Sequence, residues 1–110
     1  MVAEMRITVP VARVLAVLLA APQDDHYGHT LMRASTLSSG TLYPILARLT
    51  EAGWVSKRWE NVDPAIEARP ARACYRLTAD GLVAARQRLA ELHAHKRAAA
   101  TGIASKEALA

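Results

Sequence analysis

The chain has 110 residues, a length that allows one domain and excludes a multidomain protein. Apolar residues make up 52% of it and Phe is absent, so we expect a small aliphatic core. The net charge of +4 favours an anionic partner such as nucleic acid, and the single cysteine, Cys74, excludes an intramolecular disulfide. A chain without a disulfide suits the reducing cytoplasm, where we expect this protein. The most apolar stretch, residues 9–21, is too short to span a bilayer, so we expect no membrane partner.

Two helices come first along the chain. Thr8 is a suitable N-cap for a helix over residues 9–21, and Asp25 is a suitable cap for a second helix over residues 26–35. Only residues 36–38 separate the second helix from the next one. This short connection predicts a helix-turn-helix.

The third predicted helix covers residues 39–52, with Ser38 as its N-cap and Gly53 as its C-terminal stop. Its apolar residues recur at the spacing i, i+3, i+4, i+7, which predicts one buried stripe made of Leu42, Ile45, Leu46 and Leu49. The opposite face carries almost no bulky apolar group and is therefore available to a partner.

A β-hairpin and a last helix follow. Residues 54–60 and 74–77 have the composition of strands, and the loop between them contains two prolines and both signs of charge. The predicted fold is mainly α (α+β): a winged helix-turn-helix with a two-stranded β wing and a C-terminal dimerisation helix.

This fold implies a simple domain organisation. We expect a DNA-binding domain over residues 1–78, a dimerisation helix over residues 79–100 and a disordered tail over residues 101–110.

Small polar groups and one arginine gather on the exposed side of the third helix. The Ser39 and Thr41 hydroxyls can meet phosphates, and Gly40 lets the backbone approach them closely. Tyr43 and Arg48 can reach base edges or the sugar-phosphate chain, and arginine commonly pairs with guanine. We call these five residues the reading face and expect them to contact DNA. The alternative is an ordinary core helix with solvated polar residues.

Positive charge also gathers on the predicted hairpin. We expect the wing cations (Lys57, Arg58, Arg69 and Arg72) to lie along phosphates or to enter the minor groove. The alternative is that these charges are solvated and protect an edge strand from aggregation.

Apolar residues of the last helix step by three and four positions, as in a coiled-coil seam formed by Leu82, Ala85, Leu89 and Leu92. The same spacing fits a helix that packs on its own domain. Because the helix follows the wing and leads away from the core, we favour dimerisation.

No pattern in the sequence indicates catalysis or a cofactor. The histidines lack the Cys/His spacing of a zinc site, and no nucleophile–base arrangement or phosphate-binding glycine loop is present in the sequence. We therefore expect neither a metal nor an enzymatic activity.

Three motifs together resemble the PadR-like family of winged helix-turn-helix transcriptional regulators. They are Tyr-Gly at residues 27–28, Gly-Thr-Leu-Tyr-Pro at residues 40–44 and Tyr-Arg-Leu-Thr at residues 75–78. The resemblance covers residues 9–92 and fits a short form with a single C-terminal helix. It implies a homodimer that binds palindromic operator DNA, usually as a repressor, and whose last helix makes the dimer. It also implies that some members release DNA when they bind a small aromatic effector.

We therefore expect a sequence-specific regulator of transcription that acts as a homodimer on double-stranded DNA and lies on the bacterial nucleoid while bound. Two alternatives stay open at this point. One is a protein-interaction module built on a winged helix, and the other is a ligand sensor with weak DNA binding.

Overall fold

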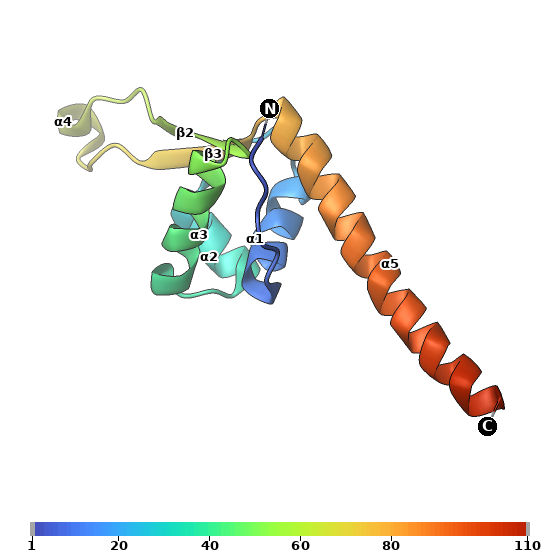
Figure 1. Cartoon of the computed structure of the whole chain (residues 1–110). Helices are drawn as coiled ribbons and strands as arrows, with labels where there is room; N and C mark the ends of the chain where they lie inside the picture. The colour runs from blue at the N-terminus through green and yellow to red at the C-terminus, as the bar shows by residue number, and fades with distance from the viewer. Residues whose placement is uncertain (1, 110) are drawn as a thin grey trace.

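Three helices pack around one core, with a β-hairpin on one side and a long helix on the other (Figure 1). The computed structural model describes the backbone of residues 2–109 and the side chains of residues 2–100. The core is aliphatic except for two large aromatic side chains, those of Trp54 and Tyr75, which are 2% and 5% exposed. The absence of Phe therefore did not exclude aromatic packing.

Helix α1 (Val9–Ala20) begins where the sequence predicts. The backbone N–H of Val11 donates to the Thr8 hydroxyl at 3.3 Å, which makes Thr8 the N-cap. The inward side of the helix supplies the centre of the core with Val11, Val14, Leu15 and Leu18.

The second helix is shorter than predicted. Helix α2 covers Gly28–Ser35, and the two residues before it form strand β1 (His26–Tyr27), which pairs antiparallel with β3 (Ala73–Leu77). The prediction that Asp25 caps this helix is wrong, because Tyr27 occupies the N-cap position. The backbone at 26–27 finds its hydrogen-bond partners in the sheet, which only the folded chain brings within reach.

Helix α3 (Ser39–Glu51) has the buried stripe that its spacing predicts: Leu42, Ile45, Leu46 and Leu49 are at most 2% exposed. Ser38 occupies the N-cap position, but its hydroxyl donates to the Thr41 hydroxyl at 3.3 Å and accepts no capping hydrogen bond from a backbone N–H. Gly53 follows the helix with a φ of 83°, which explains why glycine ends it.

The wing is a hairpin of β2 (Val55–Trp59) and β3, as predicted, but it belongs to a larger sheet. The sheet has three strands in the order β1-β3-β2, because β1 adds to the free edge of β3. The loop between β2 and β3 also contains a short helix, α4 (Pro64–Glu67), at the tip of the wing. No pattern in the sequence predicts strand β1 or helix α4.

Helix α5 (Ala79–Leu109) starts against the core and then leaves the body of the molecule (Figure 1). The α5 backbone continues through Leu109, whereas the sequence predicts a disordered tail over residues 101–110, and residue 110 lies outside the described chain. A side chain at Gly81 would collide with the backbone carbonyl of Trp54, so glycine allows α5 to approach the core closely. No described helix has both the length and the hydropathy that a membrane crossing requires.

Candidate nucleic-acid interface

The reading face is solvent-exposed along its whole length but points in two directions. Ser39, Gly40, Thr41, Tyr43 and Arg48 are all exposed. Tyr43 and Arg48 lie roughly 140° apart around the helix, because successive residues turn by about 100°. Tyr43 leans toward the wing, whereas Arg48 lies beside the N-terminal segment near Met5.

Arg48 is not held by any acidic group among the described residues. Its Nε donates to the Pro44 carbonyl at 3.4 Å, a long contact within its own helix. The guanidinium therefore remains available to a partner on the outer side of α3.

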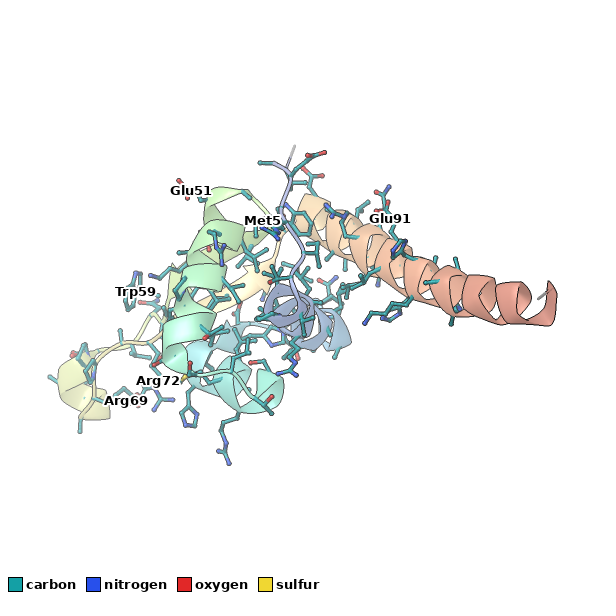
Figure 2. The ribbon with its side chains drawn as sticks, turned by 60° about the horizontal axis from the view of Figure 1, so that its bottom comes forward. Met5, Glu51, Trp59, Arg69, Arg72 and Glu91 are labelled. Atoms are coloured by element: carbon teal, nitrogen blue, oxygen red, sulfur yellow. The ribbon has the colours of Figure 1, made fainter. Side chains whose placement is uncertain are left out.

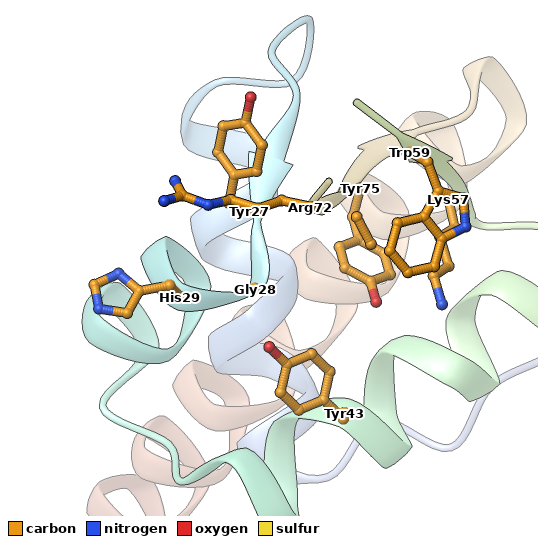
Figure 3. A pocket seen from close by; sticks show the side chains of 9 residues that line it. Tyr27, Gly28, His29, Tyr43, Lys57, Trp59, Arg72 and Tyr75 are labelled. Carbon is orange, nitrogen blue, oxygen red and sulfur yellow. The ribbon is translucent and has the colours of Figure 1, made fainter. Parts of the chain in front are cut away.

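An aromatic cleft of about 430 Å³ lies between the start of α2, helix α3 and the β2–β3 hairpin (Figure 3). Its lining residues are Tyr27, Gly28, His29, Tyr43, Lys57, Trp59, Arg72, Ala73 and Tyr75. A side chain at Gly28 would collide with the Tyr43 hydroxyl, so the tyrosine fits directly against the start of α2. All nine residues belong to the described chain and none of them is acidic, which makes the cleft attractive to anions.

The hairpin divides its cations between two faces. Neighbouring positions on a strand point to opposite sides of a sheet. Lys57 lines the aromatic cleft, while Arg58 lies on the other face, where its Nη2 donates to the Asp25 carboxylate at 2.7 Å. Arg76 joins it there with its Nε 3.1 Å from Asp25 Oδ1, an ionic contact without the alignment of a hydrogen bond. Arg58 is therefore already engaged within the chain.

Asp25 has a different role from the helix cap that we predicted. The hydrogen bond from Arg58 is the main reason that the pKa of this carboxyl lies below its ordinary value, and the charge of Arg76 acts in the same direction. Asp25 thus ties the wing to the turn before β1. Sequence reasoning missed this role because the partners lie far apart along the chain.

Arg69 is engaged as well. Its Nη1 and Nη2 donate to the two carboxylate oxygens of Glu60 at 2.7 and 3.2 Å. Glu60 also accepts from the Tyr27 hydroxyl at 3.1 Å and from the backbone N–H of Arg72 at 2.9 Å. These donors, Arg69 first, lower the pKa of Glu60 to about 2. The same contact with Glu60 raises the pKa of Tyr27.

Lys57 and Arg72 form no ion pair within residues 2–100. The Lys57 ammonium lies 5.1 Å from the centre of the Trp59 ring, a cation–π contact that leaves its charge free. The Arg72 side chain is exposed beside the aromatic cleft. Figure 2 shows Arg69 and Arg72 at the wing end of the molecule and Glu51 at the far end of α3. Of the four predicted wing cations, these two are available to an external anion.

The predicted seam of α5 begins inside the core of its own chain. Ala85 is fully buried in the core, and Leu82 and Leu89 pack against it. Leu92 is half-buried, and every residue from 93 to 100 is exposed. The first turns of the seam therefore pack on the core of their own chain. The later part of α5 remains available to pack against another helix.

The histidines do not assemble a metal site within the described residues. No group of three or more His, Cys, Asp or Glu side chains comes together there. Cys74 is buried on β3.

Comparison with solved structures supports the fold. A PadR-like transcription factor from Bacteroides fragilis is 21% identical with a TM-score of 0.65, and the match covers 83% of this chain and 86% of that one. The protein smu.1704 from Streptococcus mutans is 23% identical with a TM-score of 0.66, and 94% of each chain is covered. A MarR family regulator from Silicibacter pomeroyi is 24% identical with a TM-score of 0.58, but the 90% of this chain that matches covers only 64% of that protein.

The sequence itself matches one family model. Residues 17–87 match the model of the transcriptional regulator PadR-like family, which is more than half of the chain. No curated protein matches the sequence.

Proposed function

Because the chain belongs to the PadR-like family of transcriptional regulators, we propose that it binds operator DNA sequence-specifically and represses transcription. One observation carries this proposal. Tyr43 of the reading face shares the aromatic cleft with Lys57 and Arg72, the free cations of the wing, and no carboxylate lines it. A surface of this kind suits a polyanion that runs from α3 to the hairpin.

The two directions of the reading face suit two parts of a duplex. The outer side of α3 enters the major groove, where Arg48 reaches base edges. Tyr43 and the wing then meet the sugar-phosphate backbone that borders this groove. Base contacts supply specificity in this arrangement, and the backbone contacts set the position of the protein on DNA.

The active form in this proposal is a homodimer joined through α5. The second half of α5 leaves its own domain, and a helix without tertiary contacts is only marginally stable in water. Pairing with the α5 of a second copy covers Leu92 and stabilises the helix. Two reading faces related by such a dimer would match half-sites spaced by about 34 Å, one turn of DNA.

We also propose that a small aromatic effector releases the protein from DNA, because some members of the PadR-like family respond in this way. The aromatic rings of Tyr43 and Trp59 offer surface to such a compound, and a compound seated there would compete with DNA. Titration of simple aromatic acids and amines into the DNA complex tests this part separately.

The first experiment is a binding selection followed by an affinity measurement. The full chain selects duplexes from a random-sequence pool, and fluorescence anisotropy then compares the selected duplex with a scrambled one at low and physiological salt. We expect a preference for the selected duplex that persists at physiological salt. Equal binding to both duplexes that disappears with salt would reject the proposal and favour a protein-interaction module.

A further inference from the structure

Two tyrosine hydroxyls point into the aromatic cleft without a hydrogen-bond partner. Tyr75 belongs to the core and is only 5% exposed, yet it lines the cleft with its hydroxyl (Figure 3). Tyr43 faces it from α3 and is 43% exposed. Neither hydroxyl makes a hydrogen bond to any group within residues 2–100. A polar group that a buried ring aims at an open cleft is suited to a ligand.

The sheet places a positive charge beside these hydroxyls. Lys57 and Tyr75 are direct cross-strand partners in the β2–β3 register, so their side chains lie on the same face. Arg72 lines the same cleft from the strand end. An adjoining groove along α3 contains Glu51, so the positive end of this surface is the end beside α2. Tyr43, Tyr75 and Lys57 line both hollows, and an anion beside them is attracted to the side of Arg72, away from Glu51.

We propose that the aromatic cleft binds one phosphodiester group of the DNA backbone, with the Tyr75 and Tyr43 hydroxyls donating hydrogen bonds to its oxygens and Lys57 and Arg72 supplying the positive charge. This inference rests on the proposed function, because it names the part of DNA that this site recognises. It also assigns a binding role to Tyr75, which lies outside both the reading face and the wing cations.

The chemistry of the hydroxyl fits this role. Burial, and then the proximity of Tyr43, raise the pKa of Tyr75, so its hydroxyl keeps its proton at neutral pH and acts as a donor. Hydrogen bonds to a charged acceptor are the stronger kind. Because phosphates carry no sequence information, the contact fixes the protein's position on DNA without selecting a base.

The Tyr75→Phe variant of the full chain tests the inference. It removes the hydroxyl and leaves the buried ring in place, so the thermal unfolding midpoint should stay within the error of the wild type. We expect about tenfold weaker binding to both the selected and the scrambled duplex, as for the loss of one charge-assisted hydrogen bond. A lowered unfolding midpoint with unchanged DNA affinity would mean that the hydroxyl has only a structural role, and would overturn the inference.

Methylphosphonate scanning locates the contact on the DNA. Duplexes that carry one neutral methylphosphonate at a time should reveal a position in each half-site where the wild type loses about tenfold in affinity. The Tyr75→Phe variant should lose clearly less at that same position, because its contact is already gone. If the variant keeps the full sensitivity of the wild type at every position, the cleft does not hold a phosphodiester.

Two variants that each remove one positive charge test the role of Lys57. Lys57→Met should make the fall of log affinity with log salt shallower by about 0.9, the value for one phosphate contact. Arg13→Met removes one positive charge from the exposed side of α1 and should leave that slope unchanged. Equal slopes for the two variants would overturn the role of Lys57.

Failure of the inference is distinguishable from failure of the proposed function. If the wild type prefers the selected duplex but Tyr75→Phe binds equally well, the cleft assignment is wrong and the function stands. If the wild type binds every duplex equally and Tyr75→Phe still binds more weakly, the sequence-specific function is wrong and the cleft assignment stands. If the wild type binds no duplex, both are wrong. If Tyr75→Phe loses affinity for inorganic phosphate, measured by NMR titration, while DNA binding is unchanged, the cleft is a small-anion site and not a DNA contact.

Discussion

The guanidinium of Arg69 binds both carboxylate oxygens of Glu60, at 2.7 and 3.2 Å, and is directed back onto the wing. The pair is largely withdrawn from solvent, with side-chain exposures of 29% for Arg69 and 12% for Glu60. It closes the loop that carries α4 and connects this loop to Tyr27 at the start of α2. A residue that the sequence presents as a phosphate contact thus stabilises the shape of the wing.

Arg69 and Arg72 should differ in their effect on DNA binding. Replacing Arg72 with Met should make the fall of log affinity with log salt shallower by about 0.9, because its free charge meets one phosphate. Replacing Arg69 with Met should change the slope much less, since its charge is already balanced by Glu60. Anisotropy titrations across a salt series measure both slopes. A large change for Arg69 and none for Arg72 would reverse these two roles.

The Glu60 network should make stability depend on pH in acid. The pKa of Glu60 is about 2 in the folded chain against an ordinary value of 4.5. A carboxyl with a lowered pKa stabilises the fold above its unfolded value, so this contribution is present above pH 4.5 and is lost as the pH falls toward 2. Urea unfolding of the wild type and Glu60→Gln over this range should give curves that converge as the pH falls.

Asp25 also titrates in acid, so its contribution needs a control. Its pKa is lowered as well, chiefly by the hydrogen bond from Arg58. The difference between the wild type and Glu60→Gln isolates Glu60, because both proteins keep Asp25. A constant difference between them from pH 6 to pH 2 would contradict the lowered pKa of Glu60.

Arg48 should contribute to sequence preference. In the proposed complex it reaches a guanine from the outer side of α3, so Arg48→Ala should weaken binding to the selected duplex by about 1–3 kcal/mol. Binding to the scrambled duplex should weaken much less. Arg13→Ala serves as the control, since it removes the same charge at an exposed position of α1. An equal loss on both duplexes would make Arg48 a phosphate contact.

Leu92 should report on the proposed dimer. It is half-buried on the seam side of α5, just beyond the part of the helix that packs on its own core. Leu92→Glu should shift the chain to a monomer in sedimentation equilibrium and weaken operator binding. Val83→Glu places the same charge on the opposite side of α5, where Val83 is 65% exposed, and should leave the oligomeric state unchanged. A wild-type chain that sediments as a monomer at binding concentrations would exclude the dimer.

The sequence by itself determined the features that depend on local spacing. Thr8 starts α1 because its hydroxyl accepts a backbone hydrogen bond three residues on. The stripe of α3 is buried because its apolar residues recur with the helical period. Gly53 ends α3 because it adopts a positive φ at little cost. Each of these signals is contained within a few neighbouring residues.

Only the tertiary structure decided which groups pair across the chain. His26–Tyr27 is a strand because β3 lies beside it, and a two-residue strand carries no periodicity of its own. Alternation along β2 puts Lys57 and Arg58 on opposite faces, but their partners, Tyr75 and Asp25, come from distant segments. The charges of Arg58 and Arg69 are balanced within the fold, whereas the hydroxyl of Tyr75 is left free at the cleft. These outcomes depend on distances between segments that no local pattern encodes.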